Sequence, residues 1–398
     1  MPWRDSSPMD QRTQFVSEYH TDLFTMTELA EQYGISRKTA YKWVARYDAE
    51  GAGGLIERSR RPHHSPTATD DDVAEALVSL RKRHPRWGAK KLLAVLRRTQ
   101  PDTAWPNRST VCTLLKQRGL VVARARRRRT PLAAPPPPVM RKPNEVWTTD
   151  FKGEFRTGDH VYCYPLTLRD GFSRFVLRCD ALPSPTYQAT RRRFERAFAE
   201  YGLPDRIRSD NGTPFASTGL ARLSRLSVWW IRLGIIPERI APGHPEQNGS
   251  HEQFHAVLKA ATARPPATNA AAQQQRFRRF CAEYNHERPH EALRDCSPAS
   301  CYQPSARSLP ARLPPIEYAG HLEIRRVSEI GQVSWRGHFY FVSSALAGED
   351  VAFEEVDDGV WTVYFANVIL GRVDERHRRI HPVAPFTEGR SAASPPRA

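Results

Sequence analysis

Apolar residues follow two different periods along this chain. In residues 1–122 they recur every three or four positions, which predicts helices. From Asn144 onward, apolar, β-branched and aromatic residues alternate with polar ones in short runs such as VWTTDF, which predicts strands. Between these parts, RARRRRTPLAAPPPPV has a composition that cannot form a packed core. We therefore expect helical domains, an extended linker at residues 123–143, and a sheet-containing domain after it.

Two helix-turn-helix domains are predicted ahead of the linker. In residues 1–62, Thr25–Glu28 can form a capping box and Ser36 can cap the next helix. Residues 66–122 repeat the helical spacing and predict a second domain, of winged or homeodomain-like type, for which packing without DNA contact has nearly equal weight. Basic and aromatic residues at the starts of the second helices and in the linker are the candidate DNA contacts. They are Arg37, Lys38, Tyr41, Lys42, Arg108, Arg126, Arg127 and Arg128.

The remainder of the chain is predicted to form three further parts. Residues 144–305 begin with three strands and continue with alternating helices and strands, which predicts a mixed α/β domain. Residues 314–376 contain short alternating runs separated by glycine turns and predict a small SH3-like β-barrel. Residues 377–398, rich in Arg, Ser and Pro, predict a disordered tail.

Three acids of the α/β domain are candidates for chemistry. Asp150 lies inside a strand with apolar and aromatic neighbours, where a carboxylate is costly to bury unless it binds something. Asp210 ends a short strand before an Asn-Gly turn, and Glu252 lies in the first turn of a helix that Ser250 can cap. Each acid alone has an ordinary explanation. Together, two strand carboxylates and one helix carboxylate are what a two-metal phosphoryl-transfer site needs.

The helix that carries Glu252 is predicted to have two faces. At about 100° per residue, Glu252, His255 and Lys259 share one face, and Phe254 and Leu258 share the opposite one. The apolar face should pack against the domain, so Glu252, His255 and Lys259 are expected to point into a cleft.

Charge and cysteine content narrow the function further. The chain has 398 residues and a net charge of +17. Residues 1–142 contain 27 basic and 14 acidic residues, whereas residues 143–398 contain 33 and 29, so nucleic acid is expected to bind mainly to the first third. The six cysteines lack zinc-site spacing and predict reduced thiols in a cytosolic protein. No apolar run is long enough to predict a membrane span.

Four segments carry a resemblance to a known family. WTTDF, SDNGTPF, HPEQNGSHEQF and YNHERPHEAL, in this order, resemble the integrase core of insertion-sequence transposases in the retroviral-integrase superfamily, whose fold is ribonuclease H-like. The resemblance implies that Asp150, Asp210 and Glu252 form a DDE triad that binds two Mg²⁺ or Mn²⁺ ions. It also implies that Glu246 is not a ligand.

Residues near the triad also receive roles from this resemblance. It implies that His255 and Lys259 face the DNA end beside the metal ions. In YNHERPHEAL it leaves two roles open, because Asn285, Arg288 and His290 could either buttress the catalytic helix or touch DNA.

The resemblance implies a DNA transposase. Such an enzyme binds the terminal inverted repeats of an insertion sequence, cleaves at the element ends and joins the 3′-OH ends to target DNA. A homodimer or larger oligomer on DNA, in the bacterial cytoplasm and associated with the nucleoid, is expected. Two alternatives are a metal-dependent nuclease without strand transfer, and a helix-turn-helix regulator with an inactive core.

Overall fold

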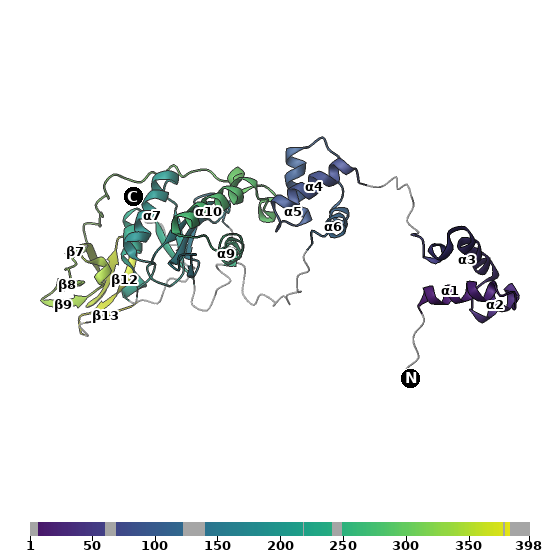
Figure 1. The fold of residues 1–398 in the computed structure, drawn as a ribbon. Helices are drawn as coiled ribbons and strands as arrows, with labels where there is room; N and C mark the ends of the chain where they lie inside the picture. The colour runs from purple at the N-terminus through teal and green to yellow at the C-terminus, as the bar shows by residue number, and fades with distance from the viewer. Residues whose placement is uncertain are drawn as a thin grey trace. The chain divides into compact units, whose positions relative to one another are not determined.

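The computed structural model describes residues 7–59, 69–121, 140–217, 219–240, 249–376 and 379–382. These residues belong to two compact units, Met1–Asp70 and Asp71–Ala398. Figure 1 shows the chain coloured from the N-terminus to the C-terminus, with labels on several helices and strands of both units. The predicted linker is described only from residue 140 onward, and almost all of the predicted tail lies outside the described residues, so both stay predictions.

The first unit is a small helical domain. Its elements are α1 (Pro8–Tyr19), α2 (Met26–Gln32), α3 (Arg37–Glu50) and the 3₁₀ turn η1 (Gly51–Leu55). The expected capping box is present, since the Thr25 backbone N–H donates to Glu28 Oε2 at 2.8 Å and Thr25 Oγ1 accepts from the Glu28 N–H at 3.4 Å. Ser36 caps α3 by accepting from the Thr39 N–H at 3.3 Å. The helices close around a core that includes Leu29, Ala40 and Trp43, so the helix-turn-helix prediction is confirmed at the level of its helices.

The second unit begins with another three-helix module. Its helices are α4 (Asp71–Arg83), α5 (Ala89–Thr99) and α6 (Arg108–Gln117). Leu77, Leu92 and Val111 are fully buried in the shared core, one from each helix, as the helical spacing predicted. Trp87 closes the end of this core and stacks on His84 with ring centroids 3.7 Å apart.

The central domain is built on a mixed sheet. Its strands are β1 (Val146–Phe151), β2 (Phe155–Arg156), β3 (Tyr162–Asp170), β4 (Val176–Leu182), β5 (Arg206–Ser209) and β6 (Ile236–Arg239). They lie in the order β2-β3-β1-β5-β6, and β4 also pairs with β3. Strands β1, β3 and β4 pair antiparallel, whereas β5 and β6 continue from β1 in parallel. This is the mixed sheet of a ribonuclease H-like domain, and the α/β prediction is confirmed.

Helices cover both faces of this sheet. The helical elements are α7 (Tyr187–Tyr201), η2 (Leu220–Arg222), α8 (Arg225–Arg232), α9 (Gly249–Thr262), α10 (Ala270–Ala282), the π-helical turn η4 (Glu283–Glu287), η5 (Glu291–Leu293) and η6 (Pro298–Cys301). On one face, Trp147 of β1 packs with Phe194 of α7 and Trp230 of α8. On the other face, Phe254 of α9 and Phe277 of α10 pack against β3 and β4. The alternation of side chains along β1 therefore turns Trp147 toward one helix layer and Thr148 toward the other.

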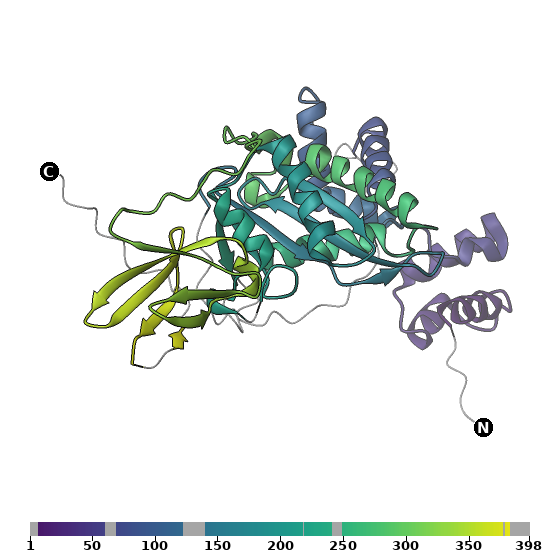
Figure 2. The same cartoon turned by 90° about the vertical axis from the view of Figure 1, so that its left-hand side faces the viewer.

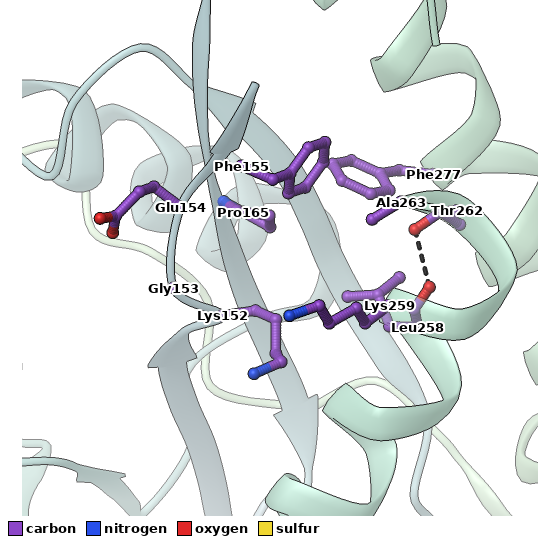
Figure 3. A pocket seen from close by; sticks show the side chains of 10 residues that line it. All are labelled: Lys152, Gly153, Glu154, Phe155, Pro165, Leu258, Lys259, Thr262, Ala263 and Phe277. Atoms are coloured by element: carbon purple, nitrogen blue, oxygen red, sulfur yellow. Dashed lines mark hydrogen bonds between the residues drawn. The ribbon is translucent and has the colours of Figure 1, made fainter. Parts of the chain in front are cut away.

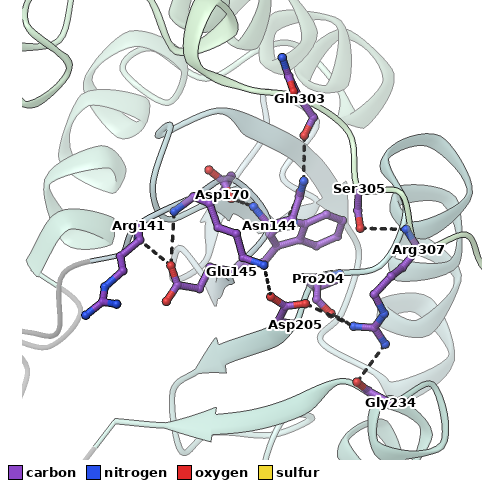
Figure 4. A network of polar contacts seen from close by, with 12 residues as sticks. Arg141, Asn144, Glu145, Asp170, Pro204, Asp205, Gly234, Gln303, Ser305 and Arg307 are labelled. Atoms are coloured by element: carbon purple, nitrogen blue, oxygen red, sulfur yellow. Dashed lines mark hydrogen bonds and ion pairs between the residues drawn. The ribbon is translucent and has the colours of Figure 1, made fainter.

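A polar network fixes the start of β1 (Figure 4). The Asn144 backbone N–H donates to Asp170 Oδ1 at 2.8 Å, and its side-chain amide donates to the Gln303 carbonyl at 2.8 Å. Asn144 Oδ1 accepts from Trp147 Nε1 at 2.9 Å. Nearby, Arg307 donates to the carbonyls of Pro204 and Gly234. The segment after the core thus ties together the beginnings of β1 and β5, the two central strands.

The C-terminal part is a sheet domain. Its elements are β7 (Glu323–Arg326), β8 (Gln332–Trp335), β9 (His338–Phe341), η7 (Ser344–Leu346), β10 (Asp350–Asp357), β11 (Val360–Phe365), β12 (Val368–Asp374) and β13 (Arg379–His381). Five strands form an antiparallel sheet in the order β13-β12-β11-β10-β7, and β8 and β9 form a separate hairpin. The outer strands β7 and β13 do not pair with each other, so the predicted closed barrel is not confirmed. Figure 2 shows this domain beside the core, where Val228 and Ile231 of α8 share its hydrophobic cluster.

Within the described part of the chain, none of the helices combines the length and the hydropathy that crossing a membrane requires. The six cysteines are all free thiols.

Candidate active site

The strand register brings Asp150 and Asp210 level with each other. Strands β1 and β5 run parallel, and Thr148 lies opposite Arg208. Asp150 lies two residues further along β1 and Asp210 directly follows the end of β5, so this register, when extended by two residues, sets the two acids level. Because neighbouring strands lie about 4.8 Å apart, the two carboxylates belong to one site at the carboxyl ends of these strands.

Helix α9 carries Glu252 to the same region. Thr167 of β3 is the register partner of Asp150, and its hydroxyl lies 2.7 Å from His251 Nε2 and 2.7 Å from His255 Nε2. His255 Nδ1 lies 3.5 Å from Asp150 Oδ2. Glu252 follows His251 directly and is exposed, so α9 lies against β1 and β3 with its acid at the solvent-facing edge.

Burial and neighbouring negative charges raise the pKa of Asp150. Burial is the main cause that raises its pKa to about 7, and the charges of Asp210 and Glu252 add to the effect. Burial also raises the pKa of Asp210, and its buried Oδ1 has no hydrogen-bond partner among the residues that the structure describes. A carboxylate pair with an orphaned oxygen suits a hard cation, because a cation would both neutralise the site and satisfy that oxygen.

No group of three or more His, Cys, Asp or Glu side chains in the described ranges has the arrangement of a formed metal site. The donors themselves fit Mg²⁺, since all three candidate ligands are carboxylates. The charges of Asp210 and Glu252 also contribute to the raised pKa of Asp150. Glu246 lies outside the described residues.

His255 lies on a different face of α9 from the one predicted. It is only 3% exposed and sits with His251, Phe254 and Leu258 on the buried face, so the prediction that it faces DNA is wrong. The physical reason is that the sheet surface beneath α9 is polar, with hydroxyls of Thr148 and Thr167 that accommodate imidazole rings. Burial lowers the pKa of His255 to about 3 and keeps the ring neutral.

Lys259 is exposed, as predicted, and lines a small pocket beside the candidate site. The pocket has a volume of about 50 Å³ and lies between the end of β1 and α9. Lys152 and Lys259 are part of its lining, and Phe155, Leu258 and Phe277 are among its apolar residues (Figure 3). Lys152, two residues after Asp150, had not been singled out from sequence.

The candidate DNA contacts of the helical domains lie on the surface. Arg37, Lys38, Tyr41 and Lys42 are exposed at the start of α3, and Arg108 is exposed at the start of α6. Arg126, Arg127 and Arg128 lie outside the described residues. Contact of any of these residues with DNA stays a prediction.

Two buried polar residues support the site from behind. Arg169 of β3 is 2% exposed and donates to the Ser250 carbonyl at 3.1 Å and to Ser250 Oγ, fixing the start of α9. Sequence reasoning missed it, although an arginine inside an otherwise apolar strand is a usable signal. Asn285 pairs with both backbone groups of Val176, at 2.8 and 3.0 Å, which favours the buttressing role.

Other acids of the core have structural partners. Asp170 accepts from the backbone N–H groups of Asn144 and Ser173, at the turn after β3. Asp180 pairs with Arg178 at 2.9 Å. These contacts give both acids a structural role in the sheet and its turns.

Comparison with known protein families matches five stretches of the chain. They are a helix-turn-helix domain at residues 11–63, a homeodomain-like domain at 39–115, an integrase core domain at 140–245 and again at 233–298, and the C-terminal domain of IS481 family transposases at 322–381. These matches, with the relatives below, support a bacterial insertion-sequence transposase of the retroviral-integrase superfamily.

Two bacterial relatives and one solved structure illustrate the likeness. The uncharacterized 31.7 kDa protein of insertion element IS407 from Burkholderia multivorans is 27% identical, over 69% of this chain and 93% of that protein. The uncharacterized 39.2 kDa protein of IS476 from Xanthomonas euvesicatoria is 26% identical, over 62% of this chain and 69% of that protein. The HTLV-2 integrase catalytic core domain in complex with magnesium is 16% identical, with a TM-score of 0.32 over 40% of this chain and 97% of that one.

Proposed function

We propose that this transposase binds the terminal inverted repeats of its insertion sequence, cleaves at the element ends and joins the freed 3′-OH ends to target DNA. Asp150, Asp210 and Glu252 are the proposed catalytic triad. The observation that carries the proposal is the register that sets Asp150 level with Asp210, with α9 and its Glu252 held against the same strands.

The proposed cofactor is a pair of Mg²⁺ or Mn²⁺ ions held by the triad. Bound there, the ions would supply activation of the attacking oxygen and stabilisation of the leaving one at phosphorus. Asp150 and Asp210 would bind from the sheet, and Glu252 would bind from the helix. Burial and, after it, the charges of Asp210 and Glu252 raise the pKa of Asp150, and a bound cation would offset both effects.

Other parts of the chain hold the DNA in this proposal. The exposed starts of α3 and α6 contact the ends, and Lys152 and Lys259 contact phosphates beside the triad. Two ends must be processed together, so a homodimer or larger assembly forms on DNA. The reaction takes place in the bacterial cytoplasm on nucleoid DNA.

The triad is tested by three variants, Asp150→Asn, Asp210→Asn and Glu252→Gln. Each should abolish both cleavage of end-labelled DNA and joining to a plasmid target in Mg²⁺ or Mn²⁺, while end binding stays intact. Glu154→Gln removes an acid from the rim of the neighbouring pocket and should retain both activities. Joining by any purified triad variant removes that residue from the triad.

The same assay separates the alternatives. A nuclease without strand transfer would cleave the ends and yield no joined product. A DNA-binding regulator with an inactive core would bind the ends and do neither. The presence of all three acids around one strand register favours the transposase over this regulator.

A further inference from the structure

Four buried polar side chains form a continuous run of contacts that leads to Asp150. Thr148 Oγ1 lies 2.9 Å from His251 Nδ1, and His251 Nε2 lies 2.7 Å from Thr167 Oγ1. Thr167 Oγ1 lies 2.7 Å from His255 Nε2, and His255 Nδ1 lies 3.5 Å from Asp150 Oδ2. All four side chains before Asp150 are buried, so each donor needs an acceptor among the groups that surround it.

The number of hydrogen atoms in the run fixes its direction. An ionised Asp150 can only accept, so a donation across the 3.5 Å ion-pair contact requires the His255 proton on Nδ1. The neutral His255 ring then accepts at Nε2, and the neighbouring donor is the single hydroxyl hydrogen of Thr167. Because that hydrogen is used, the short contact between Thr167 and His251 requires His251 to donate from Nε2.

The last step follows in the same way. With its proton on Nε2, His251 accepts at Nδ1 from the Thr148 hydroxyl. The two backbone carbonyls that compete for the threonine hydrogens lie farther away, at 3.3 Å from Thr148 Oγ1 and at 3.0 Å from Thr167 Oγ1. Every contact in the run is therefore satisfied by one assignment of hydrogens.

We propose that Thr148, His251, Thr167 and His255 form a one-directional hydrogen-bond chain that fixes the orientation of the Asp150 carboxylate as a cation ligand. The chain occupies Oδ2 from one side and leaves the rest of the carboxylate free to bind. These four are positioning residues, because they act through Asp150. The inference rests on the proposed function, since it assigns Asp150 to cation binding. Partners of this kind commonly change metal affinity by about tenfold or more.

Removing one hydroxyl tests the chain. Thr167→Val keeps the shape of the side chain and deletes the link between the two imidazoles, whereas Thr167→Ser keeps the link. Thr190→Val is the matched control, because Thr190 is also fully buried and its hydroxyl has no hydrogen-bond partner. We expect Thr167→Val to weaken Mn²⁺ binding to the full chain about tenfold, measured from free Mn²⁺ by electron paramagnetic resonance. Thr167→Ser and Thr190→Val should bind as the wild type does.

Two amide variants test the last link. Asn at position 255 places an amide nitrogen near the position of Nδ1, and Gln places one near Nε2. His255→Asn should therefore retain more Mn²⁺ affinity than His255→Gln. Equal losses in both variants would show that only the packing of the ring matters, and would overturn the proposed link to Asp150.

The predicted proton positions can be observed directly. In the full chain labelled with ¹⁵N-histidine, long-range proton–nitrogen correlation spectra at pH 8.5 should show His251 protonated at Nε2 and His255 at Nδ1. Signals are assigned by their loss in His251→Asn and His255→Asn. The opposite tautomer at either ring would overturn the direction of the chain.

The outcomes distinguish this inference from the proposed function. If the wild type binds no Mn²⁺, or if Asp150→Asn and Asp210→Asn leave binding unchanged, the proposed metal site is wrong. If those two variants abolish binding but Thr167→Val binds normally, the site stands and the positioning chain is wrong. A loss in Thr190→Val as large as that in Thr167→Val would also overturn the chain.

Discussion

At the scale of single residues, the ionised Asp150 carboxylate that would bind a cation also lowers the stability of the folded protein when no cation is bound. This carboxylate is partly buried and feels the charges of two other acids, and its pKa is raised to about 7. Without a cation, the folded protein holds a proton there that the unfolded chain releases at much lower pH. Stability from this group is therefore present at acidic pH and is lost as the pH rises toward 7.

Asp150→Asn should remove this loss of stability. In EDTA at pH 8, we expect the variant to be more stable than the wild type by up to about 4 kcal/mol, at about 1.36 kcal/mol per pKa unit. At pH 5 the difference should fall to about 1.6 kcal/mol, because the folded wild type still holds the proton there whereas its unfolded chain has already released it. Urea unfolding followed by the fluorescence of the buried Trp147 and Trp230 reports on the core. Equal stability differences at the two pH values would contradict the raised pKa of Asp150.

Lysine is scarce in the second part of the chain, which makes its placement informative. After residue 142 the sequence contains two lysines, Lys152 and Lys259, among 33 basic residues. They come from different elements and both line the pocket beside the triad (Figure 3). Two ammonium groups at one pocket form a suitable contact for a DNA phosphate.

Lys152→Ala and Lys259→Ala should each weaken binding of element ends at every DNA sequence. Each lost phosphate contact should reduce the slope of log affinity against log salt by about 1. Arg264→Ala, which removes an exposed charge just beyond α9, is the control and should leave the slope unchanged. Unchanged slopes for both lysine variants would show that the pocket does not hold DNA.

At the scale of elements, the helices and strands were predictable where one signal decided them. The capping residues Thr25 and Ser36 start α2 and α3, and strand β1 follows its apolar and β-branched run. The face of α9 was not predictable in the same way. A helical wheel groups His255 with Glu252 as polar residues, but the structure buries His255 because Thr167, distant in sequence, offers it a hydroxyl.

The small β-barrel predicted for the C-terminal part was not confirmed, and here too the outcome depends on contacts between segments that are distant in sequence. Alternation in the C-terminal part predicts strands, and strands are present from β7 to β13. Whether a sheet closes depends on which edges pair, and that depends on strand length and register rather than on local pattern. The edge strands β7 and β13 have four and three residues, and each pairs on one side.

Asn285 shows how one side chain can join two elements. Its side-chain amide accepts from the N–H of Val176 in β4 and donates to the carbonyl of the same residue, as the backbone of a neighbouring strand would. We expect Asn285→Ala to destabilise the core by about 2 to 4 kcal/mol, because two buried backbone groups lose their partners. His286→Ala, at the exposed neighbouring position, should change stability little. Urea unfolding in EDTA measures both, and equal stability in the two variants would contradict the clamp.

At the scale of the second unit, charge joins the three-helix module to the core. Arg83 pairs with Glu287 at 2.8 Å, and Lys90 pairs with Glu291 at 2.9 Å. His84 also contacts Glu283 at 2.9 Å. The positive charge of the first third is thus partly matched by acids of the core, which the charge count along the sequence did not reveal. Exposed ion pairs of this kind are individually weak and screened by salt.

Salt should therefore loosen the module from the core before either part unfolds. We expect hydrogen exchange in α4 and α5 peptides to rise between about 0.1 and 1 M salt, as the Debye length falls from about 10 to about 3 Å. Glu287→Arg should give the same increase at low salt by repelling Arg83, and the exchanged pair Arg83→Glu with Glu287→Arg should reverse much of it. Asp102→Arg reverses an exposed acid of the module that has no ion pair with the described residues, and should have no such effect. Exchange that is insensitive to both salt and Glu287→Arg would mean that apolar packing, rather than charge, holds the module in place.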